Sequence, residues 1–229
     1  MKKKILLVTL IVCVLAMTIA STTIAYFTDT ESAKNTFTMG DVDIKLFEYD
    51  NSGALVDTAN ATERTLAYTN KYPGETFKKH PTIQNVANDA AYVAAIITLG
   101  SGAGASVNTQ FANNDALKAF LSGGALNAAS DDYDIKIVRD TTVDTITIYI
   151  IATAPVAKDG TVVLFEDIVI PAKWDKAEMT KFAAMTIDIQ AYAVQTSGFN
   201  SAEAAIKAAF STANGDGYNS NAAFDSYFN

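Results

Sequence analysis

Apolar and polar residues alternate over several stretches of the chain, with the period of a β-strand that has one buried face. Val42, Ile44 and Leu46 alternate with Asp43 and Lys45. The same alternation, or an apolar run of strand length rich in β-branched residues, recurs at 92–99, 145–150, 161–170 and 187–190. The pattern predicts a fold in which β-strands dominate.

Turn sequences stand between the predicted strands. Tyr72-Pro73-Gly74 precedes Thr76, and Lys158-Asp159-Gly160 precedes Thr161. Gly and Asp-Gly readily adopt the positive φ angles of tight turns. We therefore expect antiparallel strands linked by turns.

A first short helix is predicted over residues 113–121. Leu117 and Phe120 recur there at helical spacing, and Gly123-Gly124 supplies a stop signal. Upstream, residues 100–108 are rich in Gly, Ala and Ser, which predicts a loop.

A second short helix is predicted after Asn200. Asn200 and Glu203 have the spacing of a capping box, and Ile206 and Phe210 then lie on one helical face. The polar composition of residues 212–229 predicts a mobile tail. Both helices are therefore expected to be peripheral to a β scaffold.

The N-terminus has the pattern of a secretory signal. Lys2-Lys3-Lys4 is followed by uncharged residues from Ile5 to Ala20, and Thr23 and Ala25 place small side chains where a signal peptidase requires them. We expect cleavage between Ala25 and Tyr26. The protein would then contact a membrane only before cleavage, through the signal peptide.

The same segment allows two other interpretations. Residues 5–24 are also long enough for an uncleaved transmembrane anchor. Cys13, the only cysteine, is preceded by Val12 where a lipoprotein signal requires a small residue, so lipidation is not expected. The chain after residue 25 contains no cysteine, so neither disulfides nor thiolate metal sites can stabilise it.

The charge balance bears on the possible partners. The 229 residues carry 17 Lys and Arg against 25 Asp and Glu, a net charge of -8 and a pI of about 4.6. Loss of the three N-terminal lysines leaves 14 basic and 25 acidic residues, a net charge of -11. An acidic surface repels phosphate backbones, so nucleic-acid binding is not expected.

Residues able to support catalysis are few. His80, within Lys78-Lys79-His80-Pro81, is the only histidine, and no second His or Glu stands at the spacing of a zinc-protease helix. We interpret His80 as an ordinary surface histidine and expect neither a catalytic site, a metal site nor a cofactor.

Acidic side chains occur as pairs and in one polar loop. The pairs are Asp41 with Asp43, Asp131 with Asp132, and Glu166 with Asp167, and a glycosidase would need two such carboxylates facing a cleft. Asp41 and Asp43 share one face of a predicted strand, and we interpret them as solvent-exposed. Residues 214–219 have the oxygen-rich composition of a calcium loop but lack spaced carboxylates and a closing bidentate Glu. Calcium binding is therefore not predicted.

Several short stretches of the sequence form a recognisable set. They are Ala25-Tyr26-Phe27-Thr28-Asp29-Thr30-Glu31-Ser32, Asn35-Thr36-Phe37-Thr38-Met39-Gly40-Asp41-Val42-Asp43-Ile44, Tyr72-Pro73-Gly74-Glu75-Thr76 with Ile83-Gln84-Asn85, Ala91-Tyr92-Val93, and Ile189-Gln190-Ala191-Tyr192-Ala193-Val194-Gln195. The set resembles the TasA/camelysin family of exported proteins from Gram-positive bacteria, whose signal peptides are removed by the signal peptidase SipW. The chain departs from the family at residues 85–89, Asn85-Val86-Ala87-Asn88-Asp89, where Asn-Thr-Gly is commoner.

The resemblance implies a jelly-roll-like β-sandwich whose subunits assemble into extracellular fibres of a biofilm matrix. It also implies that the freed segment Tyr26 to Ser32 acts as a donor strand for a neighbouring subunit. The expected partners are therefore further copies of the chain, possible other matrix proteins, and SipW. The expected organisation is a signal peptide (1–25), a donor strand (26–35), an all-β antiparallel sandwich with short peripheral helices (36–211) and a polar tail (212–229).

Three functions remain open from the sequence. The first is a secreted structural subunit of fibres at the cell surface or in the matrix. The second is a camelysin-like surface metallo-endopeptidase, because some family members are so named. The third is a monomeric surface adhesin that binds ligands through its loops.

Overall fold

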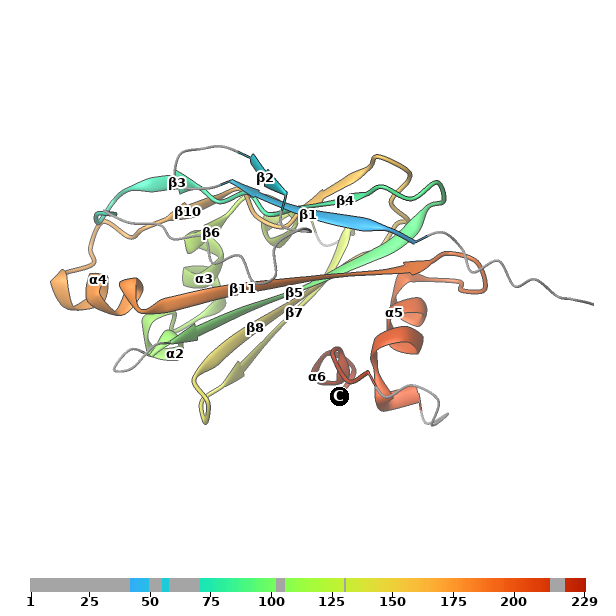
Figure 1. Ribbon diagram of the computed structural model, residues 1–229. Coiled ribbons are helices and arrows are strands. Elements are labelled where there is room, and N and C mark those ends of the chain that lie inside the picture. The colour runs from blue at the N-terminus through green and yellow to red at the C-terminus, as the bar shows by residue number, and fades with distance from the viewer. Residues whose placement is uncertain (1–41, 50–54, 58–70, 102–105, 130, 215–220) are drawn as a thin grey trace, which may run out of the picture. The chain divides into compact units, whose positions relative to one another are not determined.

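The computed structural model describes residues 42–49, 55–57, 71–101, 106–129, 131–214 and 221–229, and it confirms the predicted antiparallel β-sandwich with short helices (Figure 1). One layer is a four-stranded sheet, here called the long sheet, in the order β11-β5-β8-β7. Its strands are β5 (Ala91–Ser101), β7 (Tyr133–Asp140), β8 (Thr145–Ala152) and β11 (Met185–Gln195).

Two smaller sheets form the other layer. The first has the order β2-β1-β4-β9, with β1 (Ile44–Tyr49), β2 (Leu55–Asp57), β4 (Thr82–Asn85) and β9 (Thr161–Val163). The second has the order β3-β10-β6, with β3 (Thr76–Lys78), β6 (Leu121–Ser122) and β10 (Asp167–Val169). Every strand pair is antiparallel, and the chain passes between the layers several times, so that neighbouring strands are often far apart in sequence.

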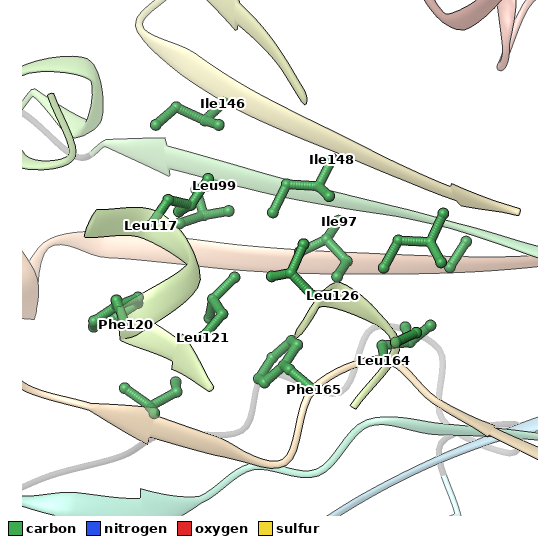
Figure 2. Packing of buried hydrophobic residues seen from close by; sticks show 14 of the residues in the cluster. Ile97, Leu99, Leu117, Phe120, Leu121, Leu126, Ile146, Ile148, Leu164 and Phe165 are labelled. Atoms are coloured by element: carbon green, nitrogen blue, oxygen red, sulfur yellow. The ribbon is translucent and has the colours of Figure 1, made fainter. Parts of the chain in front are cut away.

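The main core lies between the layers. Ile146, Ile148 and Ile150 of β8 point into it, together with Ile97 and Leu99 of β5 (Figure 2). All five side chains are essentially fully buried. The alternation predicted for 145–150 therefore marks the inner face of a central strand.

Short helices close one end of this core. They are α2 (Val107–Gln110), α3 (Asn114–Phe120) and α4 (Lys176–Ala183), and the 3₁₀ helix η1 (Ala125–Asn127) follows β6. Phe111, Phe120, Trp174 and Phe182 pack together there, with ring centroids 4.8 to 6.0 Å apart.

The outer face of the long sheet carries a second core. It is covered by α5 (Ala202–Phe210), the 3₁₀ helix η2 (Thr212–Asn214) and α6 (Asp225–Phe228). Phe224 is completely buried, and its ring lies 5.5 Å from Tyr149 and 5.2 Å from Tyr192. The predicted polar tail thus does not describe residues 221–229, because Phe224 and its aromatic neighbours bury apolar surface against the sheet.

A carboxylate joins the two ends of this C-terminal cover. Asp225 accepts hydrogen bonds from Ser211 Oγ (2.7 Å), from the Thr212 backbone N–H (2.7 Å) and from the Thr212 hydroxyl. The hydroxyls of Thr212 and Ser211 lower the pKa of Asp225. The end of α5 is therefore held against the start of α6.

Three local predictions were wrong. Residues 161–170 form two strands in different sheets, because the consecutive residues Leu164 and Phe165 are both fully buried and a straight strand cannot point both to one side. Ser201, and not Asn200, caps α5 by accepting from the Ala204 N–H.

The third wrong prediction concerns where β5, α2 and α3 begin or end. The described parts of the predicted loop 100–108 belong to β5 and α2, and α3 ends by passing directly into β6 before Gly123. Gly123 and Gly124 have positive φ angles of 79° and 59° and follow β6, so they terminate the strand instead of the helix.

We predict that Phe224→Ala lowers the free energy of unfolding by about 3–5 kcal/mol, because it leaves a cavity in the second core. Urea unfolding followed by circular dichroism measures this loss. Val143→Ala is the control, since Val143 is 67% exposed and should change the stability by less than about 0.5 kcal/mol. Equal effects of the two substitutions would show that residues 221–229 do not pack on the sheet.

Candidate functional site

The predicted cleavage site and donor strand lie outside the described residues. This applies to Ala25, Tyr26, Phe27, Thr28, Asp29, Thr30, Glu31 and Ser32. It applies also to Asp41 and to the calcium-like loop from residue 215 onward. These predictions remain predictions, and the structure bears on them through the surfaces that could receive such a strand.

His80 lies in the connection between β3 and β4. Its backbone has a φ of 50°, its N–H donates to the Glu166 carbonyl (3.0 Å), and its own carbonyl accepts from the Thr82 hydroxyl (3.1 Å). The side chain is partly buried. The backbone hydrogen bond to Glu166 thus holds His80 within the connection between β3 and β4.

The predicted carboxylate pairs lie in three separate places. Asp131 and Asp132 are exposed before β7, and Asp43 is exposed before β1. Glu166 is exposed just before β10, and Asp167, the first residue of β10, is partly buried. Within the described ranges, no three side chains of His, Cys, Asp or Glu gather closely enough to hold a metal ion.

A buried ion pair fixes β1 to the β3–β4 connection. Lys79 Nζ lies 2.9 and 3.0 Å from the two carboxylate oxygens of Glu48, and the side chains are only 6% and 9% exposed. The partners are 31 positions apart, so their contact joins segments that are distant in sequence.

Asn85 organises the turn formed by residues 85–89. Its side chain is fully buried, donates to the carbonyls of Asp89 (2.9 Å) and Val156 (2.8 Å), and accepts from the Ala87 N–H (3.1 Å). The turn is therefore held by the asparagine side chain and needs no glycine at the following positions.

Asp144, in the β7–β8 turn, anchors the start of α2. Its carboxylate accepts from Ser101 Oγ (2.5 Å), from Ser106 Oγ (2.9 Å), and from the Asn108 N–H (3.3 Å) and Nδ2 (3.1 Å). Partial burial would raise the pKa of this carboxyl, but the hydrogen bonds from Ser101, Ser106 and Asn108 outweigh it and lower the pKa to about 2.

The two edges of the long sheet are the largest surfaces able to bind another strand. Among the described strands, β11 and β7 each have a neighbour on one side only, and they are 11 and 8 residues long. The edge strands of the smaller sheets, β2, β9, β3 and β6, are only two or three residues long.

The β7 edge is tied to its surroundings on both faces. Arg139 Nη1 donates to the Phe111 carbonyl (2.6 Å), and its Nη2 donates to Asn114 Oδ1 (3.1 Å). Lys136 Nζ donates to the Tyr227 carbonyl (2.8 Å) on the other face.

The β11 edge has a different character. Thr186, Asp188 and Gln190 are exposed on its outer face, and Ile187 and Ile189 are partly buried on its inner face. The rim of the sandwich here is completed by β1, which lies beside β11 (Figure 1).

Comparison of the chain with protein-family models, with curated proteins and with solved structures found no match. Among the described residues, no helix combines the length and apolar character needed to cross a bilayer. The geometry of the chain's own residues is therefore the basis for any assignment.

Sequence reasoning missed the features that differ most between the two edges. The Ile-rich alternation at 187–190 identified a strand but could not identify it as an edge, because strand order depends on contacts between distant residues. A signal was nevertheless present, since 11 consecutive residues from Met185 contain one charged side chain.

We predict that Lys79→Met lowers the free energy of unfolding by about 3–5 kcal/mol, because it leaves the buried Glu48 carboxylate unpaired. The double variant Glu48→Leu/Lys79→Met should recover most of the loss. Lys71→Met is the control, since the Lys71–Glu75 pair joins residues four apart with Glu75 31% exposed and should contribute less than about 1 kcal/mol. A double variant no more stable than the single one would contradict the prediction.

We predict a pH-dependent stability contribution from Asp144. The pKa of this carboxyl falls from 3.8 to about 2 on folding, so its contribution is complete above about pH 4 and is lost as the pH falls toward 2. Asp144→Asn should lower Tm at pH 6 and flatten the decline of Tm between about pH 4 and 2. Asp131→Asn, at an exposed site, should leave both unchanged, and parallel curves for wild type and Asp144→Asn would contradict the assignment.

Proposed function

We propose that the chain is a secreted structural subunit of extracellular fibres, such as those of a biofilm matrix, and that it assembles by donating its N-terminal strand after residues 1–25 are removed. The observation that carries the proposal is the antiparallel sandwich whose long sheet ends in two edge strands of 11 and 8 residues. An open edge presents N–H and C=O groups that an incoming strand can pair.

Strand addition contributes favourable free energy to assembly. Each new backbone hydrogen bond contributes about 0.5–1.5 kcal/mol net, and burial of a Phe side chain adds about 1.5–3 kcal/mol. A donor of seven residues, Tyr26 to Ser32, contains one such side chain in Phe27. These contributions act against the loss of translational and rotational freedom on association, so stable binding requires pairing along most of the donor as well as the buried anchor.

Cleavage makes the assembly conditional. Before it, Tyr26 follows directly on the apolar signal segment, so the donor strand is held at the membrane. The resemblance of residues 25–44 to the TasA/camelysin family supports the same arrangement, with SipW as the peptidase and further copies of the chain as partners.

The alternatives have less support. No feature of the described residues favours a camelysin-like metallo-endopeptidase, because His80 serves the β3–β4 crossing and its neighbour Glu166 contacts it through backbone atoms. An adhesin would bind ligand as a monomer, so the state of assembly distinguishes it from a fibre subunit.

We predict that protein beginning at Tyr26 polymerises and that protein beginning at Lys34 stays monomeric, because the second lacks the donor strand. Light scattering measures the size, and circular dichroism checks that both have the same β-type spectrum. Polymerisation should be faster at 150 mM than at 10 mM salt, because the shorter screening length of about 8 Å weakens repulsion between acidic subunits.

Three results would count against the proposal. The first is equal polymerisation of both forms. The second is a monomer at all concentrations that binds a carbohydrate or host ligand. The third is chelator-sensitive casein hydrolysis that disappears in His80→Ala. Intact-mass analysis of the secreted protein checks separately that it begins at Tyr26.

A further inference from the structure

We infer that the donor strand of one subunit binds, antiparallel, along the edge of β11 of the next subunit that has no neighbour among the described strands, and that the β7 edge is closed to this pairing. The inference rests on the proposed function and adds to it the acceptor strand, its direction and the face on which the donor side chains lie.

The first argument is length and regularity. β11 pairs with β5 in one unbroken register from Met185 to Gln195, without a bulge. Seven donor residues span about 24 Å, and β11 spans about 37 Å, so the whole donor fits along this strand. The short edges of the other layer cannot hold it.

The second argument is the distribution of charge. β11 has a single charged residue, Asp188, and contains no Lys, Arg, Pro or Gly. β7 contains Asp134, Lys136, Arg139 and Asp140 within eight residues. Charged side chains on an edge, above all inward-pointing ones, are the usual protection of sheets against unwanted pairing.

The third argument is the difference between the inner-face side chains at the two edges of the long sheet. Residues that pair across the four strands form a row, and one such row has Ile146 of β8, fully buried on the inner face, near its middle. On one side Ile146 pairs with Leu99 of β5, which pairs with Ile187 at the β11 edge. On the other side Ile146 pairs with Arg139 at the β7 edge. The β11 edge thus has an apolar side chain where the β7 edge has a cation. Arg139 and Lys136 also tie β7 to α6 and to the segment between α2 and α3, which a new strand would displace.

The fourth argument is incomplete burial at the β11 rim. Ile97 and Ile148, in the middle of the adjacent row, are fully buried, whereas Ile189 on β11 and Ile137 on β7, at the two ends of this row, are both only partly buried. Ile44 and Leu46 of β1, beside β11, are also partly buried. A strand added to β11 would cover this apolar surface.

The outer face of β11 determines how the donor lies. It is polar at Thr186, Asp188 and Gln190 and becomes aromatic at Tyr192, whose ring lies 4.9 Å from Phe210. Every strand pair in the described structure is antiparallel, so the N-terminal end of the donor lies near the C-terminal end of β11.

This direction matches the donor sequence. Phe27 then lies beside Tyr192, and Asp29, which shares its face, lies beside Gln190 with access to water. Glu31 then stands opposite Asp188, a like-charge repulsion that opposes the pairing and weakens as salt rises. Thr28 and Thr30 turn their small β-branched side chains toward the partly covered rim. The opposite direction would place Phe27 on the polar half.

Hydrogen exchange of the secreted form beginning at Tyr26, before and after assembly, tests the acceptor. We expect exchange to slow by about tenfold or more over residues 185–195 and to stay unchanged over 133–140, because newly bonded amides exchange only on opening. Slowing over 133–140, alone or together with β11, or polymers that show no slowing in either strand, would overturn the inference while polymer formation upholds the proposed function. Failure to polymerise at all would overturn both.

Disulfide crosslinking tests the direction and the face. The chain has no cysteine after residue 25, so introduced pairs are the only thiols. Asp29→Cys combined in turn with Thr186→Cys, Asp188→Cys or Gln190→Cys should give reducible covalent multimers in at least one combination, because bonding requires Cβ atoms about 3.5–4.5 Å apart.

The matched control is Asp29→Cys with Val138→Cys. Val138 lies in the same row as Asp188, through Thr98 and Thr147, but on the β7 edge, and no multimers are expected from it. Multimers through Val138, or none with any of the three β11 positions in protein that polymerises, would overturn the assignment.

Discussion

Burial of the long sheet on both faces is the constraint on which the rest of the structure depends. The central strands β5 and β8 carry apolar side chains on both sides, so each face needs a cover. The two small sheets provide one cover, and α5, Phe224 and α6 provide the other. The edges of the same sheet then become the only long strands that are left incompletely paired in the described structure.

Three acidic residues of the described structure have structural roles. Glu48 neutralises a buried lysine, Asp144 holds the start of α2, and Asp225 closes the C-terminal cover. Each carboxylate joins segments that are separated in sequence, in a chain that has no cysteine after residue 25 and so no disulfide there to do so. The acidic side chains thus contribute to the fold by holding distant segments together.

The sequence predicted the elements whose patterns are local. Alternation located β1, β5, β8 and β11, Asp159 has the expected positive φ of 60°, and α3 begins after its cap at Asn113. It failed where the deciding contact is distant: Phe224 belongs to a core because Tyr149 and Tyr192 lie beneath it, and the break at Leu164 and Phe165 follows from the change of sheet. The contacts of Arg139 on the β7 edge could not be predicted for the same reason, because its partners Phe111 and Asn114 are distant in sequence.

The pairing of β5 with β11 also sets the order in which the molecule can form. Ala91 pairs with Gln195, and Phe224 covers strands synthesised long before it, so the long sheet cannot close until nearly the whole described chain is available. Contacts of such large sequence separation form slowly. A chain with this topology therefore cannot close its long sheet before Gln195 has been synthesised, so the sandwich completes its fold only after most of the described chain is available.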